Sequence, residues 1–134
     1  MPDSTIYLIG GDDDESGALS YTANEGQCRV VFKFRDSEIE ASGSDYFEAF
    51  SLVRLKLEKL GLIPFCYGAS LNVFPSGMCR DMGSGLSAYR LSLGKTPQRT
   101  DLVRIFESGL DVVPASVENQ KAFYAQWIQN IKEG

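Results

Sequence analysis

Among the side chains that could bind a partner or take part in a reaction, carboxylates form the densest clusters in this sequence. One run of four acids follows a glycine pair near the start of the chain, and two glutamates alternate in a later segment. Clustered carboxylates attract a positively charged protein surface and repel phosphate, so we expect a basic protein partner and no nucleic-acid partner. The residues expected to bind this partner are Asp12, Asp13, Asp14, Glu15, Glu38 and Glu40.

The acids are concentrated in one part of the chain. Residues 1–50 contain eleven acidic and three basic residues, whereas residues 51–134 contain seven acidic and ten basic residues. The formal net charge of -5 therefore conceals a strongly negative first part. This asymmetry favours the steering of a basic protein toward the N-terminal part. A solvated acidic face that keeps the protein in solution is the other interpretation.

The chain contains no histidine, and this narrows the chemistry that it can perform. Histidine is the commonest general base and a frequent zinc ligand, so Ser-His-Asp and Cys-His catalytic sites are excluded. The run that begins at Asp12 copies the start of a calcium loop, but its twelfth position, which needs a bidentate acid, is Ala23. We predict a protein that is not an enzyme, with no catalytic residue, metal site or cofactor.

An alternative site lies in the segment 76–85, which combines glycines, two methionines and an adjacent Arg80–Asp81 pair. A glycine-rich loop lets the backbone approach a ligand closely, and the charged pair would then supply polar contacts. The same segment is also explained as a turn whose charged pair ties it to its own strands. The alternative function is a small-ligand-binding domain or a histidine-free enzyme that uses Tyr67, Asn72, Arg80 and Asp81.

Cysteine content and hydropathy indicate the compartment. The three cysteines, Cys28, Cys66 and Cys79, form no C-x-x-C pair and no disulfide framework, which favours a reducing environment. The start of the chain lacks a basic and apolar signal sequence, and no segment approaches the roughly 20 apolar residues of a membrane span. We expect a cytoplasmic protein without a membrane partner. The sequence leaves its oligomeric state open.

Short strands are expected to position the acidic residues. The β-rich segment 5–9 precedes the acidic run, and 19–22 follows it as a second expected strand. Residues 28–35 and 38–41 alternate between apolar and charged side chains. This pattern predicts a hairpin whose exposed face sets lysine and arginine against glutamate across the two strands.

The first helix is predicted at 45–61. Asp45 and Glu48 have the spacing of a capping box, and Gly61 is placed to end the helix. Apolar residues recur between them at steps of three and four and form one stripe, with Arg54 among the charged residues off it. The stripe consists of Phe47, Phe50, Val53, Leu57 and Leu60.

The C-terminal part is expected to add strands and two helices. The apolar runs 62–67 and 71–74 predict strands that are covered on both faces and therefore central in a sheet. The segment 86–93 alternates and predicts another strand, whereas 101–107 and the residues after Ser116 predict helices. The last helix carries an apolar face that we expect to belong to the core, formed by Phe123, Tyr124, Trp127, Ile128 and Ile131.

These elements indicate one α+β domain over residues 1–134, with an antiparallel or mixed sheet, a central helix and two C-terminal helices packed on it. A small acidic α+β chain with no histidine and a negative N-terminal part resembles the bacterial immunity proteins that neutralise toxin nucleases. Those of contact-dependent growth inhibition systems are the closest in kind. The resemblance implies that the chain binds a cognate basic toxin domain and covers its active site. It assigns no individual residue, because the contact residues of that group vary widely.

Overall fold

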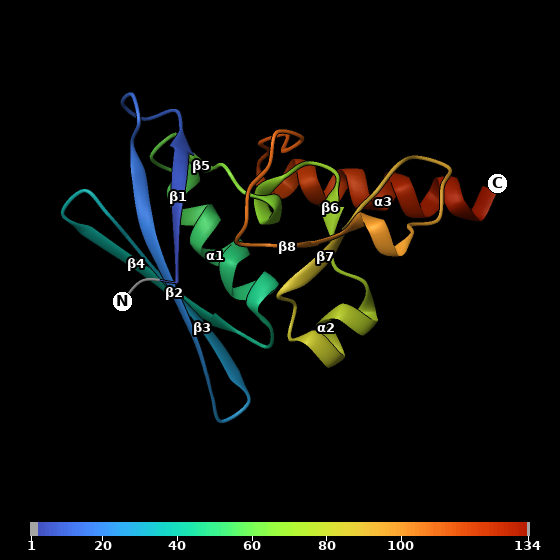
Figure 1. Ribbon diagram of the computed structural model, residues 1–134, viewed down its shortest axis with the longest axis horizontal. Helices are drawn as coiled ribbons and strands as arrows, with labels where there is room; N and C mark the ends of the chain where they lie inside the picture. The colour runs from blue at the N-terminus through green and yellow to red at the C-terminus, as the bar shows by residue number, and fades with distance from the viewer. Residues whose placement is uncertain (1–2, 134) are drawn as a thin grey trace.

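Helix α1 lies between two antiparallel sheets in the computed structural model, which describes residues 3–133 (Figure 1). The larger sheet has five strands in the order β4-β3-β2-β1-β5, and neighbouring strands are antiparallel. The predicted α+β class with a central helix is confirmed. The bounds are β1 Ser4–Ile9, β2 Ser16–Asn24, β3 Gln27–Phe34, β4 Ser37–Gly43, α1 Tyr46–Glu58 and β5 Ile63–Pro64.

The remaining strands form a second sheet of three strands in the order β6-β7-β8, whereas the sequence predicts a single sheet. Both sheets contribute to one cluster of buried side chains, which runs from Phe32 of β3 through Leu57 of α1 to Ala88 of β7. The bounds on this side are η1 Tyr67–Ala69, β6 Val73–Phe74, α2 Gly77–Gly83, β7 Ser87–Arg90, η2 Arg99–Asp101, β8 Leu102–Arg104 and α3 Val117–Glu133, where η marks a short 3-10 helix.

The three cysteines are free thiols, and two of them belong to the core. Burial raises the pKa of Cys66 to about 12 and also raises the pKa of Cys28, because a thiolate is poorly solvated in an apolar interior. Cys79 lies on α2 and is half-buried. The two core cysteines therefore act as small apolar side chains.

The β3–β4 hairpin forms as its alternating side chains predict. Val30 and Phe32 are buried on the inner face, and the register pairs Lys33 with Glu38 on the outer face. The five-stranded sheet consequently has an apolar inner face against α1 and a charged outer face over β3 and β4.

Helix α1 begins and packs as predicted. The Asp45 carboxylate accepts a hydrogen bond from the Glu48 N–H at 2.7 Å, and the Glu48 carboxylate accepts one from the Ser44 N–H at 2.9 Å. The buried residues of the predicted stripe are Phe47, Phe50, Val53 and Leu57. Leu60, in contrast, is 55% exposed, because the helix ends before it and Gly61 turns the chain with a φ of 76°.

Arg54 is fully buried, although the sequence places it off the apolar stripe. Its guanidinium donates to the carbonyl oxygens of Gly68 and Ala115 at 2.9 and 3.0 Å, and to the side-chain oxygen of Gln120 at 2.6 Å. The Gln120 amide donates to three carbonyl oxygens within 68–73. Burial lowers the pKa of Arg54 to about 10. This network explains why a charged side chain lies in the interior, because both terminal nitrogens of the guanidinium are hydrogen-bonded there, although the buried Nε has no partner among the described residues.

The runs 62–67 and 71–74 form two-residue strands, β5 and β6, and the prediction that they are central is wrong. Both are edge strands of their sheets. Proline limits each of them. Pro64 has no N–H with which to continue a ladder, and Pro75 follows β6 directly.

The predicted glycine-rich loop contains the short helix α2. The Ser76 hydroxyl accepts a hydrogen bond from the Cys79 N–H at 3.1 Å and begins the helix, and Ser84 ends it with a left-handed φ of 54°. The sequence carries both signals, a serine N-cap after a proline and a terminal Gly-Ser-Gly. The prediction of a loop is wrong because it relies on the glycine content of the segment and overlooks these two helix-capping signals.

The helix predicted at 101–107 does not form. The Asp101 carboxylate accepts a hydrogen bond from the Gln98 N–H at 2.8 Å and thereby caps η2. The next residues pair with β7 as β8, in which Val103 packs on the core while Leu102 is exposed. An apolar pattern this short fits a strand as well as a helix. Of the two predicted C-terminal helices, only α3 is present.

Helix α3 begins where predicted, and the Ser116 hydroxyl caps it by accepting from the Asn119 N–H at 3.0 Å. Its far end extends beyond the rest of the molecule (Figure 1), so its apolar face lies outside the buried core. Tyr124 stacks on Phe74 with ring centroids 3.9 Å apart, and the Trp127 indole donates to two backbone carbonyls. The half-buried residues of this face are Phe123, Tyr124, Trp127, Ile128 and Ile131.

Candidate partner-binding site

The acidic loop, residues 10–15, joins β1 to β2, and its backbone fixes its shape. Gly10 has a φ of 96°, and a Cβ atom there would lie 2.2 Å from the Gly61 carbonyl oxygen, so only glycine fits. The Glu15 N–H donates to the Asp12 carbonyl oxygen at 3.1 Å. The loop is therefore a closed turn that packs against the end of α1.

Glu15 folds back across the acidic loop and pairs with Arg35 at the β3–β4 turn. The guanidinium donates to both carboxylate oxygens, from Nε to Oε2 at 2.5 Å and from Nη2 to Oε1 at 2.9 Å. The same carboxylate accepts a hydrogen bond from the Asp12 N–H at 3.2 Å. The hydrogen bonds from Arg35 hold the pKa of Glu15 below its ordinary value. Glu15 is thus a brace for the loop rather than a free contact group.

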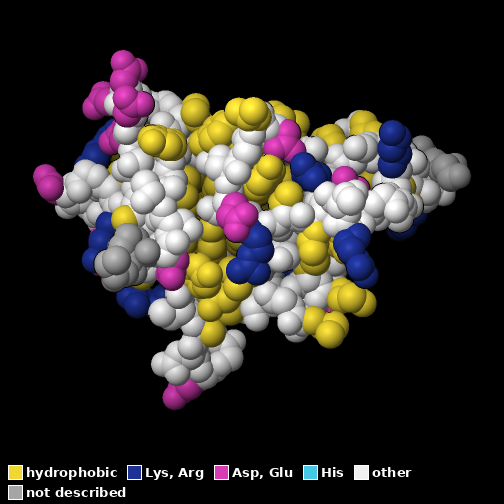
Figure 2. Space-filling model, in the orientation of Figure 1, with side chains coloured by type: hydrophobic (Ala, Val, Ile, Leu, Met, Phe, Trp, Pro, Cys, Tyr) yellow, Lys and Arg dark blue, Asp and Glu magenta, His cyan; other side chains and the backbone are white. Residues whose placement is uncertain are grey.

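The other three acids of the loop project into solvent. Asp12, Asp13 and Asp14 are exposed, and within residues 3–133 their carboxylates form no ion pair or hydrogen bond. Figure 2 shows acidic side chains gathered at this end of the molecule. The loop therefore offers a concentrated negative charge, which Arg35 offsets only in part through its electrostatic attraction to Asp12.

The two glutamates of the β3–β4 hairpin are paired, in contrast to these aspartates. Glu40 forms an ion pair with Arg29, and Glu38 forms one with Lys33 at 3.6 Å. The cross-strand pairing expected from the sequence is present. Exposed pairs of this kind contribute only about 0–1 kcal/mol each, but they cancel the local charge. Of the six acids expected to bind a partner, three are free and three have internal partners.

Two apolar side chains beside the acidic loop were not predicted as part of a site. Ile6 and Leu8 of β1 face the core, so Tyr7 and Ile9 project from the outer face of the sheet and are 59% and 46% exposed. The signal is present in the sequence. A strand that is apolar at every position from 6 to 9 leaves one apolar face uncovered when helices pack on only one side of its sheet.

Arg80, from the alternative ligand segment, is held by α1. Its guanidinium donates to the Asp45 carboxylate at 2.8 Å and lies over the rings of Phe47 and Phe74, 5.3 and 5.5 Å from their centroids. Because Asp45 also caps α1, this pair fastens α2 to the start of α1. Asp81 is exposed and forms no ion pair or side-chain hydrogen bond within the described residues.

A groove of about 310 Å³ lies beside Arg80 on the side of α1 that the five-stranded sheet leaves open. Its walls are mostly apolar, and its charged lining residues are two cations and one carboxylate. The residues that line it are Phe47, Glu48, Ser51, Leu52, Leu55, Phe74, Arg80, Val117 and Lys121. The apolar positions of α1 outside the predicted stripe are the sequence signal for this groove.

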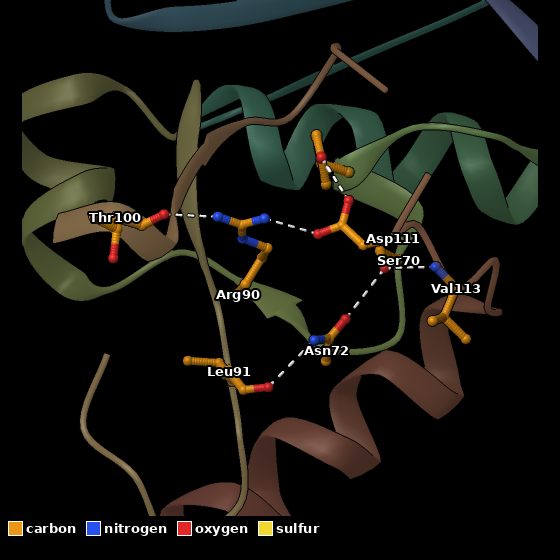
Figure 3. A network of polar contacts seen from close by, with 8 residues as sticks. Ser70, Asn72, Arg90, Leu91, Thr100, Asp111 and Val113 are labelled. Atoms are coloured by element: carbon orange, nitrogen blue, oxygen red, sulfur yellow. Dashed lines mark hydrogen bonds and ion pairs between the residues drawn. The ribbon is translucent and has the colours of Figure 1, made fainter. Parts of the chain in front are cut away.

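Tyr67 and Asn72 belong to two other groups of polar contacts. Figure 3 shows Asp111 with Arg90 in one group and Asn72 with Ser70 in the other. The Tyr67 hydroxyl and the Arg90 guanidinium donate to the two oxygens of Asp111 at 2.7 and 2.8 Å. Asn72 accepts from the Ser70 hydroxyl at 3.3 Å and donates to the carbonyl that follows β7. The bonds from Tyr67 and Arg90 lower the pKa of Asp111. Neither Tyr67 nor Asn72 lines the groove beside Arg80, so the four residues of the alternative site do not converge.

Comparison with protein-family models and with curated proteins gives no match for this chain. Within residues 3–133, no helix combines the length and apolar character that crossing a membrane requires. Over the same residues, no three cysteine, aspartate or glutamate side chains are grouped so that they could hold a metal ion. The acidic loop follows strand β1 rather than a helix, unlike the calcium loop whose first letters it shares.

Proposed function

We propose that this chain is a protein-binding inhibitor of the immunity type, which neutralises a basic toxin domain, such as a nuclease, by covering its active site. The observation that carries the proposal is the acidic loop. Asp12, Asp13 and Asp14 offer unpaired carboxylates on a turn that Glu15 and Arg35 brace. A preformed anionic surface binds without first ordering its own loop, so association costs less conformational entropy.

The charge distribution around the loop supports the same function. Because Glu38 and Glu40 are paired with bases, the uncompensated negative charge at this end comes mainly from the three loop aspartates, with Asp36 of the neighbouring β3–β4 turn. Such a field accelerates the association of oppositely charged proteins by about 10- to 1,000-fold at low salt. A domain that holds nucleic acid carries clustered lysine and arginine, and these are the groups that the loop aspartates would pair with.

Affinity capture from a lysate of the source organism tests this function. The wild-type chain and the variant Asp12→Lys/Asp13→Lys/Asp14→Lys are immobilised side by side at low salt, and retained proteins are identified by mass spectrometry. We expect one basic protein on the wild-type chain only, released by raising the salt. The purified protein should then lose its enzymatic activity when the wild-type chain is added.

A matched control separates the loop from net charge. The variant Asp81→Lys/Glu107→Lys/Glu118→Lys makes the same change of formal charge at exposed positions elsewhere. It should retain the basic protein as the wild-type chain does. The proposal would be contradicted if both variants lost the basic protein equally, or if the loop-reversal variant retained it as well as the wild-type chain does.

The groove beside Arg80 favours a second candidate function, the binding of a small ligand. Its apolar walls suit an apolar molecule, and an anionic group on that molecule would face two cations, Arg80 and Lys121, against one carboxylate, Glu48. Its volume of about 310 Å³ lies at the lower end of ordinary ligand pockets. A thermal-shift screen with aliphatic and aromatic carboxylates tests it. A ligand of the groove should raise the melting temperature of the wild-type chain but not of Leu55→Asp. The variant Leu93→Asp, at an exposed position outside the groove, serves as the control.

A further inference from the structure

The outer face of β1 is apolar where it meets the acidic loop. Tyr7 and Ile9 are exposed there, while Ile6 and Leu8 fill the core on the other side of the strand. Isolated apolar side chains are ordinary on a protein surface, and only a contiguous group indicates an interaction site. The neighbours of Tyr7 and Ile9 therefore decide what this face can do.

The neighbouring residues extend the apolar surface. Ile9 lies opposite Ile63 in the β1–β5 register, and the Phe65 N–H donates to the Tyr7 carbonyl oxygen at 2.7 Å, so each has a half-buried apolar neighbour. Leu60 is exposed in the turn whose next residue touches Gly10. We call this group the β1–β5 patch; its members are Tyr7, Ile9, Leu60, Ile63 and Phe65.

Charge surrounds the β1–β5 patch unevenly. The acidic loop starts at Gly10, directly after Ile9, so its free aspartates border one end of the patch. Figure 2 shows hydrophobic side chains close to the acidic group at this end. Across the sheet, the charged side chains of β3 and β4 are paired with one another. Lys59, which is exposed directly before Leu60, adds one positive charge, so the three free aspartates leave the charge beside the patch negative on balance.

We infer that the β1–β5 patch is the centre of the interface with the basic protein, and that the acidic loop is its charged rim. The occupant is an apolar side chain of that protein, flanked by lysine or arginine. An apolar centre with a polar rim is the usual anatomy of a protein interface. In such an interface the rim charges set the association rate, whereas buried apolar anchors set the dissociation rate. This inference rests on the proposed function, and it specifies the kind of surface on the partner that the site binds.

Binding kinetics separate the two roles. The probe is the protein that the wild-type chain retains from the lysate and the loop-reversal variant does not, after purification. Its association and dissociation rates are measured at several salt concentrations against the wild-type chain, the loop-reversal variant and Tyr7→Thr/Ile9→Thr. Threonine preserves the β-branched preference for a strand, and both positions are exposed, so this variant should unfold at the wild-type urea concentration.

We expect Tyr7→Thr/Ile9→Thr to raise the dissociation rate about tenfold or more and to leave the salt dependence of association unchanged. Loop reversal should instead lower the association rate and flatten its salt dependence. The control Met78→Thr/Met82→Thr removes a similar apolar surface from α2, where both side chains are largely exposed, and should match the wild-type chain.

Each other result counts against a defined claim. A threonine variant with wild-type dissociation, alongside a loop reversal that slows association, would overturn the role of the β1–β5 patch and leave the inhibitor function standing. If the lysate yields no protein that depends on the loop, the proposed function fails and this inference fails with it.

Discussion

The side chains of Arg54 and Gln120 meet at 2.6 Å in the interior and join α1 to the first turn of α3. The side-chain oxygen of Gln120 accepts a hydrogen bond from the buried cation, and its side-chain nitrogen donates to three backbone carbonyls. An apolar side chain of similar volume in its place would remove four hydrogen bonds from buried groups.

Gln120→Leu should therefore destabilise the protein by about 2–4 kcal/mol, because it removes one acceptor from the buried Arg54 guanidinium and the side-chain donor shared by three carbonyl oxygens. Urea unfolding followed by the fluorescence of Trp127, the single tryptophan, measures the change. Gln126→Leu, on the exposed side of the same helix, should stay within about 0.5 kcal/mol of the wild type. A small effect at Gln120 would show that the network relaxes around the new side chain.

Removal of the Glu15 brace should loosen the acidic loop without unfolding the sheet. In Glu15→Ala, the Asp12 N–H and the Arg35 guanidinium lose their shared acceptor. Hydrogen exchange should become several-fold faster at the amides of 12–15 and remain unchanged in β2 and β3. Glu107→Ala, at an exposed acid far along the chain, should leave the loop amides as they are.

Acid should release the Asp111 contacts at a pH below the usual range for a carboxylate. Hydrogen bonds from Tyr67 and Arg90 depress the pKa of Asp111 in the folded chain. Their stabilising contribution is therefore present above the unfolded pKa of about 3.9 and is lost as the pH falls through the folded pKa. In a carboxyl-detected NMR titration, Tyr67→Phe should raise the pKa of Asp111, whereas Tyr89→Phe should not. If the pKa of Asp111 were unchanged in Tyr67→Phe, the hydrogen bond from Tyr67 would not be the main cause of the lowered pKa.

Cysteine reactivity should divide the three thiols into two groups. Cys79 is half-buried on a helix that has no buried residue, whereas Cys28 and Cys66 are buried with raised pKa values. Because the thiolate is the reactive form, a disulfide reagent should modify about one thiol per native chain quickly. The Cys79→Ser variant should lose this fast phase. Fast modification of a second thiol in that variant would contradict the burial described here.

The elements that could be predicted from the sequence are those with long, regular patterns. In helix α1 and the β3–β4 hairpin, apolar side chains recur at a regular spacing over many residues, so the sequence predicts which of their side chains are buried. The errors fall where a pattern is short. The segment 101–107 has too few apolar positions to separate a strand from a helix, and the caps of α2 compete with its glycines.

The candidate site was predictable in part for a related reason. A cluster of acids is visible in the sequence, but the identity of the partner of each acid depends on which strands become neighbours. Arg35 lies twenty positions from Glu15 and becomes its partner only because β2 and β3 pair. The same limit applies to Arg54, whose acceptors come from segments that are distant in sequence.

Pro64 has a consequence for how the large sheet meets other molecules. It lies in β5, one of the two edge strands of the sheet. Because proline has no N–H, β5 cannot donate a hydrogen bond from this position to an added strand. The opposite edge, β4, carries Glu38 and Glu40, charged side chains that discourage another strand from docking. Both features disfavour the joining of sheets from two copies of this chain into a continuous ribbon. A protein that binds this sheet is directed to its broad face and the loop beside it.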